Sequence, residues 1–209
     1  MIINECSFIF NPMSPRPRLA SDAEIIQAAT RVIARLGPTG FTLAEVGREA
    51  GIAAATLVQR FGSKRDLMLA VAGRGVAAPE SCFAAARRET SSPLEALTRG
   101  LEDLASMAPT PEELSNHLAF LQIDLTDPDF HELALANALT NRKGIVELLD
   151  EAMAAGELRE CDTDRLSVAV DAIAGGALIN WAIYREGTAR EAIHDALETL
   201  LGPYRAGWE

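Results

Sequence analysis

Residues 41–67 read FTLAEVGREAGIAAATLVQRFGSKRDL. Thr42 is followed three residues later by Glu45, the pattern of a capping box that begins a helix. Gly51 comes just after this first helical segment, where a tight turn needs a residue with positive φ. Apolar side chains that can pack beneath the turn are Val46, Ala50, Ile52 and Leu57. The segment therefore predicts a helix-turn-helix, whose second helix lies in a major groove of DNA.

The same capping pattern recurs along the chain and predicts an all-α fold. Each Ser/Thr-x-x-Glu box precedes a segment with helical spacing of apolar residues. The boxes are Ser21/Glu24, Thr42/Glu45, Ser92/Glu95, Thr110/Glu113 and Thr188/Glu191, with a weaker form at Ser63/Asp66. Proline at the first helical position (Pro93, Pro111, and Pro128 after Asp127) marks further helix starts. No segment alternates as a strand would, so we expect about nine to ten helices.

The helix pattern divides the chain into three parts. Residues 1–20 are expected to form a flexible arm, residues 21–66 the helix-turn-helix domain, and residues 67–209 a second helical domain. Within the arm, residues 1–12 lack a helical pattern, which favours a native start at Met13 or disorder; an ordered arm is the alternative. After the helix-turn-helix we expect helices at about 64–77, 80–90, 93–107, 111–125, 128–155, 163–185 and 188–202, of which the first links the two domains.

The charge distribution favours a DNA-binding head on an acidic body. The 209-residue chain has a formal net charge of -11. From Met13 to Gly75, however, nine Lys and Arg stand against five Asp and Glu, while the rest of the chain is strongly acidic. A basic segment can bind phosphates, and an acidic body is repelled by them, which helps to orient docking.

The sequence favours a cytoplasmic protein. The three cysteines, Cys6, Cys82 and Cys161, cannot all pair within one chain, which is typical of reduced thiols. The N-terminus lacks a basic region before its short apolar stretch, so a signal peptide is not expected. The longest uncharged apolar stretch falls between Asp171 and Arg185, short of the roughly 20 residues that span a bilayer. We therefore expect no membrane partner.

The helix-turn-helix resembles that of the TetR family of transcriptional repressors. The matching elements are Ala50-Gly51-Ile52, the segment 56–61 (TLVQRF) and the segment 63–67 (SKRDL), and the resemblance covers about residues 20–70. It implies a homodimer that binds a palindromic operator and is released by a small-molecule effector. It also implies that the last two helices form a four-helix bundle across the two-fold axis.

The resemblance implies which residues contact DNA. Gln59 would pair with adenine, Arg60 with guanine, and Thr56 with a phosphate or a thymine methyl. Lys64 stands where the family has a phosphate contact at a helix N-terminus. The set is Arg16, Arg18, Thr42, Ala53, Ala54, Thr56, Gln59, Arg60 and Lys64.

The helix-turn-helix also departs from the family pattern. Ala53 stands where the family has a polar cap, and Ala54 where it often has a basic residue. Val58 and Arg60 replace the usual Tyr pair. These changes leave open a head that has lost its DNA affinity, in which Thr56 and Gln59 would be only solvated surface residues.

Two late helices are the expected dimer interface. The helix at about 164–185 is apolar over more than one face, and Gly175-Gly176 permits close approach of another helix. A two-fold dimer presents two heads to a palindromic site. The interface residues we expect are Leu166, Val170, Ile173, Ala177, Leu178, Ile193, Leu197 and Leu200.

The helices between about 93 and 155 are expected to enclose an effector pocket. Such pockets are mostly apolar with a few placed polar groups. The candidates are Met107, His117, Phe120, Leu121, Asp124, Asn137, Asn141 and Trp181. Taken singly, each of these is more often a core or surface residue than a ligand contact. The group Asp124, Asp127, Asp129 and His131 is explained better by a helix start than by a metal site.

The resulting prediction is a one-component regulator, most simply a repressor. A ligand-activated or co-repressor-type regulator with the same fold is the first alternative, and a helical binding module with a degenerate head is the second. An enzyme is disfavoured because the sequence has no nucleophile elbow, GxGxxG, P-loop or metal-ligand cluster. No cofactor or metal is expected.

Overall fold

The computed structural model describes residues 20–207, and in this range the chain is almost entirely helical. The predicted all-α fold is confirmed, with ten α-helices and a short 3-10 turn in the described part. The helices are α1 (Asp22–Gly40), α2 (Leu43–Ala50), α3 (Ala54–Phe61), α4 (Lys64–Gly75), α5 (Ala78–Glu89), α6 (Pro93–Ala105), α7 (Pro111–Thr126), α8 (Pro128–Ala154), α9 (Thr163–Tyr184) and α10 (Ala189–Leu201). The expected arm, with Arg16, Arg18, Cys6 and the start at Met13, lies outside the described residues.

The predicted caps begin the predicted helices. The side chains of Ser21 and Thr188 form complete capping boxes with Glu24 and Glu191. At the other predicted boxes the hydroxyl accepts the hydrogen bond of the third helical N–H. Asp127 caps α8 by accepting from the N–H of Asp129. Capping of this kind stabilises each helix by about 1 kcal/mol and explains why the helix starts were readable from the sequence.

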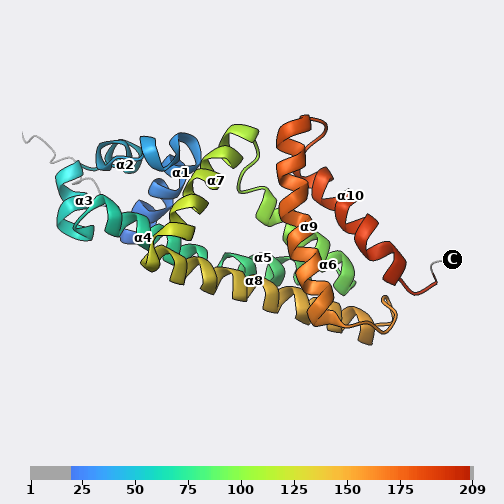
Figure 1. Cartoon of the computed structure of the whole chain (residues 1–209). Coiled ribbons are helices and arrows are strands. Elements are labelled where there is room, and N and C mark those ends of the chain that lie inside the picture. Colours follow the sequence, from blue (N-terminus) through green and yellow to red (C-terminus); the bar gives the residue numbers. More distant parts are fainter. Residues whose placement is uncertain (1–19, 208–209) are drawn as a thin grey trace, which may run out of the picture.

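The molecule is elongated, with the helix-turn-helix at one end (Figure 1). The helices α1, α2 and α3 form that end, and α9 and α10 lie toward the other. The long helix α8 runs along one side between the two ends. The head and the last two helices are therefore separated by the middle of the body.

The head shares its hydrophobic core with the body. Fully buried Ile25, Val46 and Leu57 from the first three helices pack in one cluster with Phe130 at the start of α8. Phe120 and Ile123 of α7 pack against the same cluster. Buried residues of α5, α6, α8, α9 and α10 form a second core. The head predicted at residues 21–66 is thus closed by α7 and α8, and it does not bury its core alone.

The end of α1 is a second junction between head and body. Gly37 has φ 65° and interrupts α1 three residues before its end at Gly40. The side chain of Asn116 on α7 packs against this glycine, where a Cβ would lie 2.6 Å from Asn116 Oδ1. Asn116 Nδ2 also donates to the carbonyl of Ala34 at 2.7 Å. Helix α7 is therefore held against α1 by a contact that needs glycine.

Candidate DNA interface and effector site

The turn of the helix-turn-helix depends on two glycines. Gly51 ends α2 in the left-handed conformation with φ 69°, as predicted. A Cβ on Gly47 would lie 2.7 Å from the carbonyl oxygen of Ile52. Gly47 therefore packs directly against the backbone of the turn. This geometry places α3 directly after α2 and leaves the outer face of α3 uncovered.

The outer face of α3 is exposed and only weakly polar. Gln59 is exposed and Thr56 is half-buried, while Leu57 points into the core. Val58 is 49% exposed and Ala55 is exposed beside it. Helical spacing puts positions 55, 58 and 59 together on the side away from Leu57. Ala55 and Val58 were not among the predicted contact residues, although this spacing alone could have found them.

Arg60 is turned away from the position expected of a base reader. Its guanidinium forms an ion pair with Asp22 and donates to the carbonyl of Ala20. The side chain is 27% exposed. Arg60 therefore ties the end of α3 to the start of α1, and it must leave Asp22 before it can pair with a guanine.

Thr42 and Lys64 both stand at helix N-termini on the head. Thr42 caps α2 and is exposed. Lys64 opens α4, and its Nζ donates to the carbonyl of Pro38 at 3.0 Å and lies 5.8 Å from the ring centroid of Phe41. A helix N-terminus with a nearby ammonium suits a phosphate. By contrast, α3 begins at Ala53 without a side-chain cap, because alanine has no acceptor to offer.

Several cations of the head are neutralised by carboxylates. Arg31 pairs with Glu49 at 2.7 Å, and Arg48 pairs with Glu45 at 2.5 Å. The hydrogen bond from Arg31 holds the pKa of Glu49 below its ordinary value. The positive charge counted along the head is therefore locally balanced, and among the head's cations Lys64 forms no ion pair with a described residue.

The structure places the expected dimer residues in the core of the protomer. Ile193 and Leu197 of α10 are almost fully buried, as are Leu166, Val170 and Ala177 of α9. Ile173, Leu178 and Leu200 are half-buried and pack against the same core. The outward face of α9 is instead formed by another set of apolar or small residues. These are Val168, Ala172, Gly175, Gly176, Ile179 and Ile183.

The outward face of α9 is unusual in carrying two open glycines. A Cβ on Gly175 or Gly176 would meet no heavy atom within 4 Å. Neither glycine is therefore required by packing within the protomer. By length and composition α9 could also cross a membrane, but the core helix of a soluble protein passes the same test.

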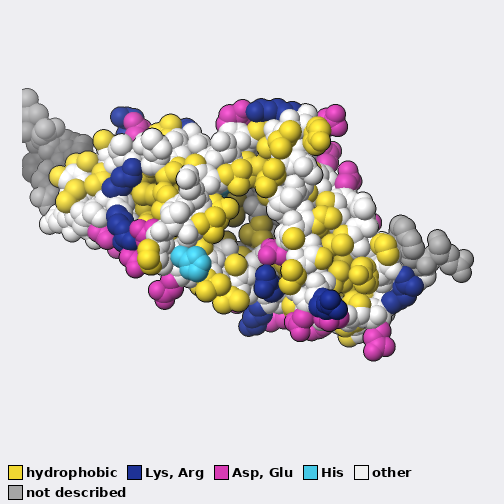
Figure 2. Space-filling view, viewed as in Figure 1, with side chains coloured by type: hydrophobic (Ala, Val, Ile, Leu, Met, Phe, Trp, Pro, Cys, Tyr) yellow, Lys and Arg dark blue, Asp and Glu magenta, His cyan; other side chains and the backbone are white. Residues whose placement is uncertain are grey.

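Figure 2 shows a hollow between α7 and α9, with hydrophobic side chains around its rim. The predicted effector residues His117 and Asp124 lie on α7 at a spacing of seven residues, which puts them on one face. Asn137 and Asn141 lie one turn apart on α8. Asn141 Nδ2 donates to Asp171 on α9 at 2.8 Å, while its buried Oδ1 has no partner in the described part of the chain. The helices around the hollow therefore carry unsatisfied polar groups.

Two titratable side chains of α7, His117 and Asp124, are partly buried. Burial lowers the pKa of His117, which favours the neutral imidazole, and its buried Nε2 lacks a partner among the described residues. Burial raises the pKa of Asp124 to about 6. No hydrogen bond or ion pair is found for the Asp124 carboxylate within residues 20–207. A buried polar atom without a partner is costly, and a carboxyl group whose pKa is raised by partial burial is often found at a functional site, which makes these groups candidates for contact with a ligand.

Three of the remaining predicted effector residues, Phe120, Trp181 and Asn137, make contacts within the fold, and two are exposed. Phe120 packs edge-to-face on Phe130 at 5.8 Å between ring centroids, in the core of the head. Trp181 is buried and donates from Nε1 to the carbonyl of Gly187 at 3.2 Å. Asn137 donates to the carbonyl of Gly75 at the end of α4. Met107 is 45% exposed, and Leu121 is 43% exposed.

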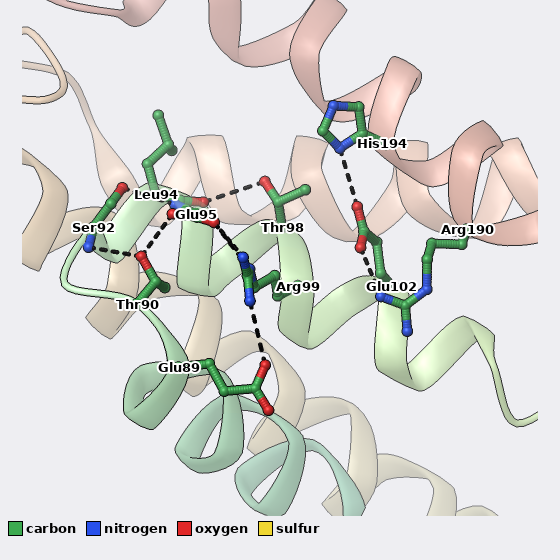
Figure 3. A network of polar contacts seen from close by, with 10 residues as sticks. All are labelled: Glu89, Thr90, Ser92, Leu94, Glu95, Thr98, Arg99, Glu102, Arg190 and His194. Carbon is green, nitrogen blue, oxygen red and sulfur yellow. Dashed lines mark hydrogen bonds and ion pairs between the residues drawn. The ribbon is translucent and has the colours of Figure 1, made fainter.

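A separate polar network joins α6 to α10 (Figure 3). Glu102, whose side chain is only 10% exposed, binds Arg190 and the Nδ1 of His194, both at 3.0 Å. Arg99 bridges Glu95 and Glu89 nearby. These residues border an open cavity of about 890 Å³. These carboxylates already pair with arginine side chains. We therefore interpret the network as a structural contact that holds α6 against α10.

Asp124 gives a pH-dependent prediction. Its pKa is higher in the fold than the ordinary 3.8, so the native state binds more protons between about pH 4 and 6, and stability falls as pH rises through this window. Asp124→Asn should therefore raise the free energy of unfolding at pH 7 by about 1 kcal/mol, a value discounted because the side chain is half-exposed. Thermal unfolding at pH 7 and pH 4 tests this. An equal change at both values would contradict it.

Comparison with protein families shows which family the helix-turn-helix matches. Residues 25–71 match the family model of bacterial regulatory proteins of the tetR family. This segment belongs to the TetR family. It spans the helix-turn-helix and the first part of α4, so the family resemblance of the sequence is confirmed. A search of curated proteins finds no significant match.

Solved structures show that most of the chain, and not only its head, has the fold seen in TetR-family regulators. A regulator from Saccharomonospora viridis in complex with choline has a TM-score of 0.70 at 22% identity, covering 86% of this chain and 94% of that chain. FadR from Bacillus subtilis in complex with stearoyl-CoA has a TM-score of 0.65 at 18% identity, covering 86% and 97%. A TetR regulator from Streptomyces coelicolor has a TM-score of 0.66 at 23% identity, covering 90% and 99%. The likeness thus extends through both domains.

Proposed function

We propose that this chain is a one-component transcriptional repressor that binds a palindromic operator in double-stranded DNA as a homodimer. The observation that carries this proposal is that the TetR family match falls on a helix-turn-helix whose α3 leaves its outer face open. An exposed second helix of this kind is the element that enters a major groove. Thr42, Thr56, Gln59 and Lys64 are the proposed contacts, with Arg60 joining them after it leaves Asp22. We place the protein in the cytoplasm.

The outward face of α9 supports the dimer. The opposite face of α9 is packed in the core, so its outer apolar face needs a partner of its own. Glycines at Gly175 and Gly176 allow the backbone of a second α9 to approach closely. A two-fold axis through this face would place the two heads for the two half-sites of an operator.

We propose that a small-molecule effector enters the hollow between α7 and α9 and releases the DNA. The similar structures from Saccharomonospora viridis and Bacillus subtilis hold choline and stearoyl-CoA. In this chain the buried Asn141 Oδ1 and His117 Nε2 have no partner within the described residues, and Asp124 is a half-buried carboxyl group with a raised pKa. An effector with an apolar body and a cationic or hydrogen-bond-donating group would satisfy them.

A helical binding module with a degenerate head is the second candidate. The observations that favour it are the uncapped start of α3 at Ala53 and the engagement of Arg60 by Asp22. The two candidates differ in whether the full chain selects any duplex sequence.

The test is a titration of the full chain against its own upstream DNA, and against duplexes selected from random sequence, at two salt concentrations. The repressor proposal predicts an affinity that falls steeply with salt. Gln59→Ala should raise the Kd for the selected site by about tenfold and leave the salt slope unchanged. Lys64→Ala should lower the slope by about one unit. Failure to enrich any sequence would favour the degenerate head.

A further inference from the structure

Arg65, in the first turn of α4, reaches across to the junction of α7 and α8. Its Nη2 lies 2.8 Å from Asp127 Oδ1 and 2.8 Å from Asp129 Oδ2. The guanidinium carbon lies 5.5 Å from the ring centroid of Phe130. Arg65 therefore contacts three residues at the start of α8, although it lies more than 60 residues away in the chain.

The residues that Arg65 contacts belong to the shared core of head and body. Phe130 is 2% exposed and packs with Val46 and Leu57 of the helix-turn-helix. The hydrogen bond from Arg65 is the largest cause that lowers the pKa of Asp127. Asp127 is also the cap of α8. One guanidinium thus connects the start of α4 to the start of α8 beside the core on which α3 rests.

We infer that Arg65 is a positioning residue, which sets the orientation of the DNA-binding head by holding α4 against the α7–α8 junction. This inference rests on the proposed function, because the orientation of α3 matters only if the head binds DNA. The junction also borders the proposed effector site, since Asp124 lies one turn before Asp127. An effector that moves the end of α7 would move Asp127, and through Arg65 it would move the head.

If Arg65 instead contacted a DNA phosphate directly, the expected change in operator affinity would be opposite for one variant, Asp129→Asn. If Arg65 served DNA directly, Asp129→Asn would free its charge and remove a repelling carboxylate, so the operator would bind more tightly. If Arg65 positions the head, Asp129→Asn weakens binding, because it loosens the contact. Asp129 suits this test because it is 64% exposed, and its side-chain partner is Arg65.

The experiment measures operator affinity and salt slope for Arg65→Gln, Asp129→Asn and the double variant. We expect Kd to rise about tenfold for Arg65→Gln and about threefold for Asp129→Asn, with the double variant no weaker than Arg65→Gln, since the two act through one contact. The salt slope should not change. Glu132→Gln, one turn further along α8, is the charge-matched control and should leave Kd unchanged. Tighter binding by Asp129→Asn, or a slope lowered by Arg65→Gln, would overturn the inference.

Hydrogen exchange of the free protein tests the same contact without DNA. Arg65→Gln should speed amide exchange in the first turns of α4 and α8, whereas Arg35→Gln, which removes a paired cation from α1, should not. Unchanged exchange in Arg65→Gln would overturn the positioning role. Because this readout needs no operator, a chain that binds no DNA would refute the proposed function without deciding the result for Arg65.

Discussion

Replacing Phe83 by alanine is expected to lower the free energy of unfolding by about 4 kcal/mol, the largest effect we predict for a single core residue. Phe83 is 1% exposed and lies between α6 and α8. A Cβ on Gly100 would lie 2.3 Å from its ring, and one on Gly144 would lie 2.4 Å from it. The two glycines that admit the ring have no side chains that could refill the space, so the cavity would stay open. Urea unfolding at fixed protein concentration measures the change.

Two further variants test whether the lost stability comes from the packing of the Phe83 ring between the two glycines or from a general destabilisation of α5. Gly100→Ala should cost about 2 kcal/mol, because the added methyl meets a ring that Gly144 holds from the other side. Combining Gly100→Ala with Phe83→Leu should cost less than the sum of the single changes, since the smaller side chain makes room for the methyl. A loss below about 1 kcal/mol for Phe83→Ala would show that the core collapses around the site.

The helix-turn-helix was predictable because its signals are local. Thr42 and Ser63 cap helices through the backbone of the next few residues, and Gly51 ends a helix through its own backbone conformation. Their spacing in the sequence is therefore enough to predict where these helices begin and end. The same holds for the caps of the body helices. The sequence therefore predicted both the fold and the exposed position of Gln59.

The outward face of α9 was harder to predict, because that helix is apolar on both sides. Val170 and Ile179 have similar side chains, yet one is buried in the protomer and the other is 44% exposed. When apolar residues surround a helix, periodicity cannot tell the inner face from the outer. The choice depends on how α10 and α8 pack against α9, which no local pattern reports.

The partners of the arginines were also beyond the sequence. The sequence predicts that Arg60 pairs with guanine, but Arg60 and Arg65 each meet carboxylates brought close only by the fold. Asp22, at the start of α1, pairs with Arg60, and Asp127, the cap of α8, pairs with Arg65. Charges far apart in the sequence pair according to the tertiary arrangement, so counting them along the chain overstates the free positive charge of the head.

Replacing Ile179 by aspartate is expected to convert the proposed dimer into a monomer and to weaken operator binding by about a hundredfold. Ile179 lies at the centre of the outward face of α9, next to Gly175 and Gly176. An unpaired carboxylate between two close helices is costly, because burial removes its water without supplying a partner. Two heads joined through this face bind two half-sites at once, and a monomer loses that gain in avidity. Light scattering of the purified protein and titration with the operator measure the two effects.

The matched control is Leu139→Asp, which places the same charge on an exposed leucine of α8. Leu139 is 56% exposed, slightly more than Ile179, and it lies on the face of α8 away from the core. If apolar exposure as such drove association, both variants would lower the molar mass. If the outward face of α9 forms the dimer, only Ile179→Asp lowers it, and thermal unfolding of the Ile179→Asp monomer shows whether the protomer keeps its own core. If the Ile179→Asp variant is still a dimer, the two-fold axis lies on another surface. That surface would then determine the distance between the two heads.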